Sequence, residues 1–473
     1  PMADKQTFAL YFGNRGFFPA SLIGSARAEM EAAVKRAGYG TLMLDAGATR
    51  HGAVETPAEG AIYADFLKQH QGEYSGVILC LPNFGDENGA VAALRDAGVP
   101  ILIQAYPDEL DKMAPELRRD AFCGKFSIMD VFCQNEIPFT ALPPHTVHPN
   151  SAQFAANLEQ FASVCRVVGG MRRMTVGAIG ARTSAFKTVR IDELALQRHG
   201  ITMETFDLSD TFARIKAVDA SGDAYKSKAD VLKAYSDFSG TPAAAFDTLV
   251  RLGVVLDTLV EEAGLNAIAV RCWIEMQQQL GISPCVLMSE MNNRGKFAAC
   301  EVDVGNAVSM YALGLAARGV TACLDWNNNY GDDENKCILF HCGPVPQAMM
   351  AAKGVVTGHA ILENAVGKGC SYGCNVGRIK PMPFTFASMA TQDGYLSFYA
   401  GEGRFTSDPI ASDFFGCAGV AEIPGLQDVL LHVGKNGHRH HVSVTPGHVS
   451  PALAEAFGNY LGYDIALPQG MLA

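Results

Sequence analysis

Carboxylates stand at both ends of one apolar stretch of this chain. In ACEVDVGNAVSMYALGLAARGVTACLDW, residues 299–326, Glu301 and Asp303 precede apolar residues at helical spacing, and Asp325 follows them. We interpret Asp303 as the N-cap of that helix, because free backbone N–H groups and the helix dipole favour an acid there. Capping does not explain Glu301, which lies in an apolar and extended segment. Asp325 ends the strand-like piece GVTACLD, and ligands of α/β folds bind where strands end.

Histidines recur in two later segments. His341 stands near the end of the apolar piece KCILFHCG, 16 residues after Asp325, a separation that suits two adjacent strands joined by the polar loop NNNYGDDENK. The segment NGHRHHVSVTPGH adds a cluster in a chain that has 12 histidines in all, and it contains His438, His440, His441 and His448. We interpret His438 as a solvent-exposed loop residue.

Two acids and two of these histidines form one candidate metal set: Glu301, Asp325, His341 and His441. Carboxylates suit Mn²⁺ and Mg²⁺, and imidazole shifts the preference toward Mn²⁺, Co²⁺ or Fe²⁺. Such a set leaves coordination positions open, which two adjacent oxygens of an open-chain sugar could fill. We expect Trp326, Asn327 and His440, which flank these ligands in the sequence, to contact the substrate.

The composition excludes several other classes of protein. The net charge is −12 over 473 residues, so no basic stripe is present to bind nucleic acid. No uncharged apolar run approaches the ~20 residues that span a bilayer, and the first residues show no signal-peptide pattern. The 13 cysteines lie mostly in apolar stretches and predict buried free thiols in a reducing compartment. We therefore expect a cytoplasmic protein with no membrane partner.

Three regions must position these residues. Strand-like pieces near 7–13, 41–47, 75–82 and 99–107 alternate with amphipathic helices, which predicts a doubly wound parallel sheet. After a proline-rich connection the alternation restarts, and beyond about residue 318 short strands are joined by glycine-rich turns. We predict an α/β fold with two doubly wound domains, 1–165 and 166–318, and a largely antiparallel β-rich domain, 319–473, that carries part of the metal site.

These motifs resemble the L-fucose isomerase and L-arabinose isomerase superfamily. CEVDVGNAVSM followed by CLDW is similar to the fucose isomerase segments whose metal-binding acids fall here on Glu301 and Asp325. HHVSVTPGHVSPALAEAFGNYLGYDIAL resembles the C-terminal segment with a metal-binding histidine, which implicates His441. ILFHCG is similar to the strand where arabinose isomerases place a further ligand, which implicates His341. FGNRGFFP resembles the segment whose arginine reaches a neighbouring subunit's substrate, which gives that role to Arg15.

The resemblance implies a metal-dependent aldose–ketose isomerase with Mn²⁺ as its cofactor, or Mg²⁺ or Co²⁺. It also implies a homo-oligomer, a trimer or hexamer, with its active site at the subunit interface. Glu301 or Asp325 would move a proton between neighbouring sugar carbons through a cis-enediol. The sequence leaves open which acid is the base, and whether a hydride shift replaces the enediol.

The substrate also stays open at this level. A neutral deoxyhexose or pentose fits the resemblance, and so does a 6-substituted or sulfonated hexose. His438, Arg439 and His440, in the segment GHRHH, could face an anionic group of such a sugar, or they could support His441. Two other classes of function remain: a cytoplasmic sugar-binding protein with two α/β domains, and a metal-dependent epimerase or aldolase that uses the same enediolate.

Overall fold

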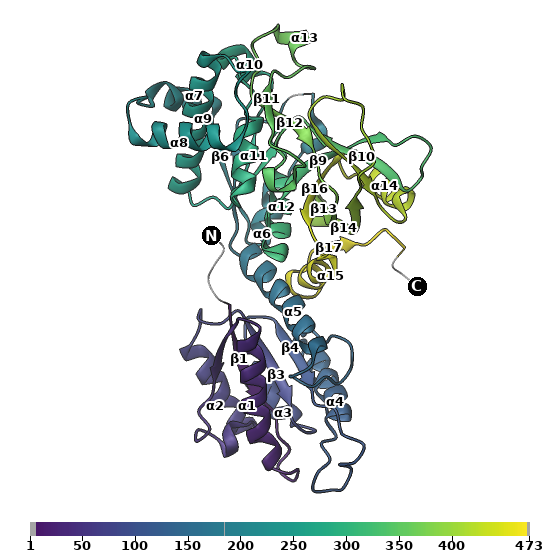
Figure 1. The fold of residues 1–473 in the computed structure, drawn as a ribbon. Coiled ribbons are helices and arrows are strands. Elements are labelled where there is room, and N and C mark those ends of the chain that lie inside the picture. Colours follow the sequence, from purple (N-terminus) through teal and green to yellow (C-terminus); the bar gives the residue numbers. More distant parts are fainter. Residues whose placement is uncertain (1–5, 184, 471–473) are drawn as a thin grey trace. The chain divides into compact units, whose positions relative to one another are not determined.

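The computed structural model describes residues 6–183 and 185–470, which form two compact units (Figure 1). One unit comprises the chain up to Gly169 together with Glu455–Gly462. The other comprises Gly170–Ala454 and the segment that begins at Tyr463. Each unit is described by itself below.

The N-terminal unit is built on a parallel four-stranded sheet of order β2-β1-β3-β4. Its strands are β1 (Thr7–Phe12), β2 (Gly40–Met43), β3 (Gly76–Leu81) and β4 (Ile101–Ala105). Its helices are α1 (Ser21–Arg36), α2 (Pro57–Gln69), α3 (Glu87–Leu94), α4 (Ala121–Gln134) and most of α5 (Ala152–Met171).

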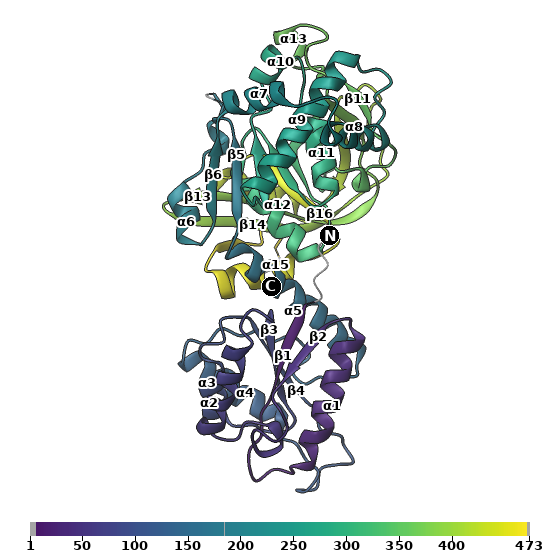
Figure 2. The same ribbon diagram turned by 90° about the vertical axis from the view of Figure 1, so that its left-hand side faces the viewer.

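Both faces of this sheet are buried. Phe8 and Leu10 of β1 pack with residues of α1 and α5, whereas Ala9 and Tyr11 pack with residues of α2, α3 and α4. Figure 2 shows α1 on one side of the strands and α2 and α3 on the other. Helices on both faces make the strands continuously apolar, which is the pattern from which the doubly wound sheet was predicted.

The second unit begins with another parallel sheet, of order β6-β5-β7-β8. Its strands are β5 (Thr175–Ile179), β6 (Thr202–Phe206), β7 (Ala267–Val270) and β8 (Phe297–Cys300). Its helices are α6 (Glu193–Arg198), α7 (Leu208–Ala217), α8 (Asp223–Tyr235), α9 (Ala243–Glu262), α10 (Glu275–Leu280), α11 (Cys285–Asn293) and α12 (Val304–Ala317).

A closed antiparallel barrel follows in the same unit. Its strand order is β15-β10-β9-β16-β13-β14, and pairing of β14 with β15 closes the ring. The strands are β9 (Ala322–Asn329), β10 (Lys336–His341), β13 (Met382–Gln392), β14 (Tyr395–Phe405), β15 (Cys417–Glu422) and β16 (His441–Pro446). Closure pairs every strand on both sides and leaves no open edge among these six.

The second unit also contains three short strands and three further helices. The strands are β11 (Val355–Thr357), β12 (Cys374–Arg378) and β17 (Asp464–Ala466), and the helices are α13 (Glu363–Val366), α14 (Leu426–Lys435) and α15 (Ser450–Ala454). The predicted fold class is confirmed: two parallel-sheet α/β regions precede an antiparallel β-rich region. The domain boundaries at 165 and 318 stay predictions.

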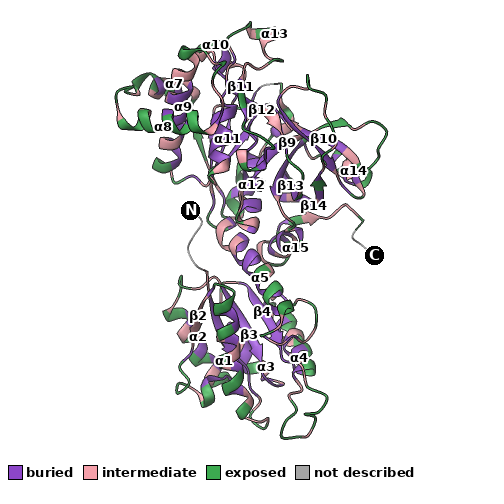
Figure 3. Ribbon diagram, viewed as in Figure 1, coloured by how far each residue is buried: buried purple, intermediate pink, exposed green. Residues whose placement is uncertain are grey.

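Helix α12 lies between the second parallel sheet and the barrel. It contacts β7 and β8 on one side and β13 and β16 on the other. Eleven of its residues are buried, and Figure 3 shows most of this helix in the colour of buried residues. A helix that is buried on most sides needs apolar residues almost all round. This packing fixes the N-terminus of α12, where Asp303 lies, against β16, where His441 lies.

Among the residues that the structure describes, no helix is both long and apolar enough to cross a membrane.

Candidate active site

Three adjacent barrel strands bring the predicted ligands together. In the ladders around β9, Asp325 lies opposite His441 of β16 on one side and opposite Phe340 of β10 on the other. His341 follows directly after Phe340. The predicted adjacency of the strands carrying Asp325 and His341 is therefore confirmed.

Strand alternation decides which side chains enter the site. Leu324 and Trp326 of β9, like Val442 of β16, pack into the barrel core. Asp325 and His441 occupy the alternate positions, so they point to the outer face of the barrel. That face is the one on which α12 packs.

Glu301 reaches the site from a strained turn between β8 and α12. Glu301 and Val302 have φ angles of 62° and 55°, the left-handed region that L-residues seldom occupy. Backbone bonds hold the turn: Val302 N–H donates to the Val270 carbonyl at 3.1 Å, and Asp303 N–H donates to the Cys300 carbonyl at 3.0 Å. Strain of about 1–3 kcal/mol per residue persists only where the surroundings enforce it, and such positions cluster at functional sites.

The acids converge on one nitrogen of His441. Nε2 of His441 lies 2.7 Å from Oε2 of Glu301 and 3.4 Å from Oδ1 of Asp325. The other oxygen of Glu301 accepts a 2.8 Å hydrogen bond from Trp273 Nε1. Asp325, His341 and His441 also present ligand atoms within 4.8 Å of one another.

Four buried atoms at this point make no hydrogen bond of acceptable geometry. They are Glu301 Oε2, Asp325 Oδ1, His341 Nε2 and His441 Nε2. Buried polar atoms are normally satisfied, and leaving one unsatisfied costs about 1–3 kcal/mol. Glu301 Oε2 and Asp325 Oδ1 both lie near His441 Nε2, and a cation there would satisfy these oxygen and nitrogen lone pairs together.

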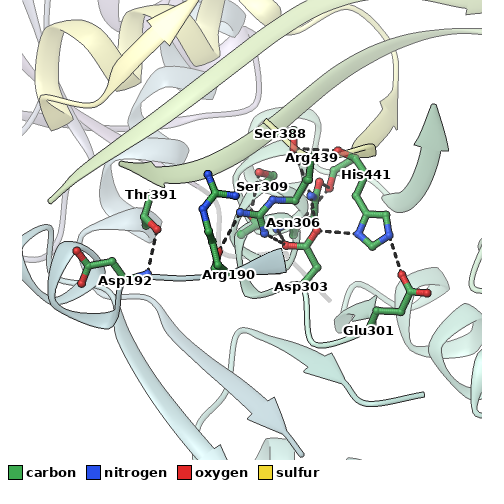
Figure 4. Close-up of polar contacts among 12 residues, drawn as sticks. Arg190, Asp192, Glu301, Asp303, Asn306, Ser309, Ser388, Thr391, Arg439 and His441 are labelled. Carbon is green, nitrogen blue, oxygen red and sulfur yellow. Dashed lines mark hydrogen bonds and ion pairs between the residues drawn. The ribbon is translucent and has the colours of Figure 1, made fainter. Parts of the chain in front are cut away.

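Asp303 fixes the orientation of His441. Its Oδ2 lies 2.8 Å from Nδ1 of His441, and its Oδ1 accepts from Arg439 (Figure 4). The same carboxylate caps α12, because Oδ1 also accepts from the Asn306 backbone N–H at 3.0 Å. The predicted N-cap is confirmed, and the same carboxylate also sets the tautomer of His441. It holds the proton of His441 on Nδ1 and leaves the Nε2 lone pair free for a metal.

Arg439 serves this network rather than a substrate anion. Its side chain is 1% exposed, and its guanidinium also donates to the Arg190 carbonyl at 3.1 Å. Of the two roles left open for Arg439, support of His441 agrees with the structure.

His341 makes hydrogen bonds of a different kind. Its Nδ1 accepts from the Cys342 backbone N–H at 2.9 Å. The neutral ring therefore carries its proton on Nε2, the nitrogen that faces the acids. In that form His341 is a hydrogen-bond donor to the site, whereas His441 is a lone-pair donor.

The other predicted contact residues are placed differently. The indole Nε1 of Trp326 donates to Tyr399 at 2.9 Å inside the barrel, so it faces away from the acids. Asn327 is exposed and bonds to Asn328. His440 lies beside the site, with Nε2 3.7 Å from Oδ1 of Asp325.

Arg15 belongs to the N-terminal unit. Its guanidinium pairs with Glu87, donates to the Gly85 carbonyl at 2.8 Å and lies 4.7 Å from the centre of the Phe84 ring. These contacts fix its side chain within that unit.

The convergent acids open into a cavity of about 230 Å³. Besides Glu301, Asp325 and His341, its lining includes Cys272, Trp273, Ser283, Cys285, Phe340, Cys342, His359, Ile361 and Leu362. Sequence reasoning missed Trp273, although it lies only three residues after the end of β7. It also missed residues 359–362, whose loop carries no recognisable pattern.

Burial and charge act differently on the two acids. Burial opposes ionisation of Glu301, but interaction with the neighbouring imidazole rings, that of His441 first, outweighs it and lowers the pKa of Glu301. For Asp325 burial prevails over the histidines and raises the pKa. A bound divalent cation would favour ionisation of both carboxylates.

His438 is a correction to the sequence analysis. It was predicted to be solvent-exposed, but both of its ring nitrogens are buried without a hydrogen-bond partner. Its ring packs edge-on to Tyr399 at a centroid distance of 4.8 Å. Burial lowers the pKa of His438 to about 4, with the charges of His432, Arg439 and Arg190 acting in the same direction.

A closed barrel presents two acids and an oriented histidine beside a small cavity, and these are residue types that can hold a metal ion. Comparison with known proteins shows the family. Residues 9–172 match the family described as "Fucose/sulfoquinovose isomerase, N-terminal domain". Residues 339–467 match the family described as "L-fucose isomerase, C-terminal domain".

Similar curated proteins carry the name sulfoquinovose isomerase. Those of Priestia aryabhattai and Priestia megaterium are each 22% identical over 379 residues, 79% of this chain and 81% of theirs. That of Alkalicoccus urumqiensis is 22% identical over 59% of this chain and 61% of its own. A solved periplasmic solute-binding protein from Actinobacillus succinogenes 130z with bound D-allose matches at 12% identity, 67% of this chain and 92% of its own, with a TM-score of 0.18 that supports no argument.

The chain belongs to the L-fucose isomerase-like family and is an aldose–ketose isomerase.

Proposed function

We propose that this enzyme interconverts a sulfonated aldohexose of the sulfoquinovose type and the corresponding ketose, with a divalent metal ion in the site. The name shared by the similar isomerases supports the choice of substrate over a neutral deoxyhexose or pentose. The single observation that carries the metal is the approach of two buried, unsatisfied carboxylate oxygens, of Glu301 and Asp325, to the unsatisfied Nε2 of His441, beside a cavity that both acids line.

Glu301, Asp325 and His441 would hold the ion. Two carboxylates and one imidazole favour Mn²⁺, with Mg²⁺ or Co²⁺ as alternatives. When bound, such an ion supplies Lewis-acid polarisation of the sugar carbonyl and its neighbouring hydroxyl. We assign His341 as a donor instead of a fourth ligand, because its Nδ1 already accepts a backbone hydrogen bond.

The proton transfers fall to the two carboxylates. One of them removes the proton on the carbon beside the carbonyl and returns it to the neighbouring carbon, so that a cis-enediol lies between aldose and ketose. The other moves the hydroxyl proton between the two oxygens. The Nε2–H of His341 would donate to whichever oxygen gains negative charge, which lowers the barrier without moving a further proton.

The test is an assay with a panel of aldoses under controlled metal content. The chain is stripped with EDTA and supplied with Mn²⁺ or Zn²⁺, and ketose formation is measured from sulfoquinovose, L-fucose and L-arabinose. We expect ketose from sulfoquinovose, little from the neutral sugars, and better recovery with Mn²⁺ than with Zn²⁺. Turnover of a neutral sugar alone would contradict the substrate, and full activity after chelation would contradict the metal.

The same assay in D₂O separates the two chemical routes. A cis-enediol exchanges its carbon-bound proton with solvent, so deuterium should enter the product at the carbon that receives the proton. Product without deuterium would favour an internal hydride shift. Release of shorter fragments, or of an epimer alone, would instead point to an aldolase or an epimerase.

Two further expectations accompany this proposal. The oligomer, a trimer or hexamer with Arg15 acting from a neighbouring subunit, derives from the family resemblance. The cytoplasmic location derives from the abundance of unpaired cysteines.

A further inference from the structure

One segment of the second unit is bonded to the parallel sheet at its start and to the barrel at its end. It lies between β5 and α6, and we call it the crossing segment; its described residues are 180–183 and 185–192. At its start, the Ala181 carbonyl accepts a 3.0 Å hydrogen bond from Arg271, the residue that follows β7. This bond ties the start of the segment to the sheet.

Three hydrogen bonds tie its other end to the barrel and to the loop before β16. The Arg190 carbonyl accepts from Arg439 at 3.1 Å, and the Arg190 guanidinium donates to the Gly437 carbonyl at 3.2 Å. The Asp192 backbone N–H donates to Thr391 Oγ1 of β13 at 2.9 Å. Figure 4 shows Arg190 beside Arg439, and Asp192 beside Thr391. Both ends of the crossing segment are therefore anchored.

Phe186 lies between these anchors, and its ring contacts residues on both sides of the active site. Its ring centre is 5.7 Å from that of Trp273, 5.5 Å from that of His440 and 5.9 Å from that of His441. Aromatic rings at such separations pack against each other. Trp273 follows β7 of the sheet, whereas the two histidines lie at the start of β16. Phe186 therefore fills the space between the sheet and the barrel at this point.

The rings that Phe186 contacts are the neighbours of the two acids. Trp273 Nε1 donates to one oxygen of Glu301 at 2.8 Å, and His441 Nε2 lies 2.7 Å from the other oxygen. Nε2 of His440 lies 3.7 Å from Oδ1 of Asp325. The side chains of Glu301 and Asp325 are only 15% and 19% exposed. Phe186 is half-buried, so part of its ring faces the solvent beside a site that is largely closed to it.

We propose that Phe186 is a positioning residue of the isomerase, which fixes the Trp273 indole against Glu301 and keeps water away from the two carboxylates. This inference rests on the proposed function, because a carboxylate that takes a proton from one sugar carbon must keep it until the neighbouring carbon receives it. Water that reaches the carboxylate exchanges that proton. Exclusion of water also strengthens the charge interactions inside the site.

The first experiment measures access of small molecules to Trp273 and needs neither metal nor substrate. The chain has two tryptophans, so Trp326→Phe leaves Trp273 as the only one. In that background, quenching of Trp273 fluorescence by acrylamide is measured with and without Phe186→Ala. We expect a larger quenching constant with Phe186→Ala and a smaller increase with Phe186→Leu, because leucine replaces part of the ring. Phe186→Tyr keeps the ring and should match the background.

The second experiment follows the proton. The Mn²⁺-loaded chain converts sulfoquinovose in D₂O, and the fraction of the ketose that carries deuterium is measured early in the reaction. Phe186→Ala should raise that fraction above the wild-type value, because water reaches the carboxylate before the proton is returned. It should also lower kcat by about tenfold or more. A purely structural role would lower the thermal midpoint and leave the deuterium fraction unchanged.

A matched control separates this effect from the general loss of a phenylalanine. Phe246 of α9 is likewise half-buried in the same unit, and its ring packs edge-on to Phe238 at a centroid distance of 4.9 Å. Phe246→Ala should leave both the quenching of Trp273 and the deuterium fraction at their reference values. Circular dichroism confirms folding of each variant, and Phe186→Leu replaces Phe186→Ala if the latter does not fold.

Two results would overturn the inference. One is equal quenching of Trp273 with and without the Phe186 ring. The other is an equal deuterium fraction in the ketose from the wild type and from Phe186→Ala, including the absence of deuterium from both. Failure of the proposed function gives a different result, because the wild type would then form no ketose from sulfoquinovose. The quenching measurement decides the role of Phe186 in that case as well.

Discussion

At the scale of single residues, the site depends on the proton positions of two histidines. Asp303 keeps the proton of His441 on Nδ1, and the Cys342 backbone N–H directs the proton of His341 to Nε2. One ring therefore offers a lone pair and the other a proton. The type of residue alone could not distinguish them, because both are histidines at strand ends.

Asp303 is accordingly predicted to be a positioning residue. Asp303→Asn should weaken Mn²⁺ binding by about 10–100-fold, because the amide no longer fixes the His441 tautomer. It should also destabilise the fold by about 3–5 kcal/mol, because Arg439 keeps a buried charge without its partner. Isothermal titration with Mn²⁺ and thermal unfolding measure the two effects. If Asp303→Asn is less stable but binds Mn²⁺ with unchanged affinity, Asp303 has only a structural role.

At the scale of elements, the packing of α12 against the barrel decides whether the acids and the histidine meet. Gly305 lies in the first turn of α12, where a Cβ would be 2.5 Å from the Met389 carbonyl oxygen of β13. Only glycine allows this approach of helix to strand. The close contact holds Asp303 within reach of His441.

Gly305→Ala should therefore destabilise the chain, by about 1–3 kcal/mol as an overpacked contact, and lower kcat. Gly434→Ala is the matched control, because this helical glycine of α14 has nothing within 4 Å of an added Cβ. It should be neutral or stabilise by up to about 1 kcal/mol. Equal thermal midpoints for the two variants would contradict the packing argument.

The loop between α14 and β16, which carries His438, should make the free energy of unfolding depend on pH. The pKa of the folded-state ring is lowered to about 4, below the ordinary value near 6.5, so the unfolded chain takes up a proton first as pH falls. The contribution of His438 to the free energy of unfolding is therefore fully present above pH ~6.5. It is lost between pH ~6.5 and ~4, and the loss is at most about 3 kcal/mol.

His438→Gln should reduce this loss, measured as the fall in thermal midpoint from pH 7.5 to pH 5. His448→Gln, at an exposed position of the same unit, serves as the control. Its thermal midpoint should decrease from pH 7.5 to pH 5 by as much as that of the wild type. An identical fall in all three proteins would show that His438 does not contribute.

At the scale of the whole molecule, the family resemblance implies that Arg15 acts in the active site of a neighbouring subunit. We predict complementation between two inactive variants, Arg15→Ala and Glu301→Gln, if a neighbouring subunit supplies Arg15. In randomly mixed oligomers about a quarter of the sites would combine intact copies of both residues, so about a quarter of the activity should return. Activity that stays at the sum of the two variants would contradict a shared site.

Much of the fold could be predicted from periodicity. Continuous apolar strands between amphipathic helices indicated both parallel sheets, and short strands with glycine-rich turns indicated the β-rich region. The 16-residue interval from Asp325 to His341 indicated neighbouring strands, which β9 and β10 are.

Other features depend on contacts between distant segments and have no local signal. Asp303 and Arg439 are 136 residues apart in sequence, and their pairing follows from the packing of α12 on the barrel. Trp326 was expected in the site because it adjoins Asp325, yet strand alternation sends it into the barrel core.

The most direct measurement is the anomalous diffraction of crystals soaked in Mn²⁺. We predict one strong peak on the outer face of the barrel, about 2.0–2.2 Å from a Glu301 oxygen, an Asp325 oxygen and Nε2 of His441. A peak elsewhere, or no peak at saturating Mn²⁺ in a chain that still isomerises its sugar, would contradict the account.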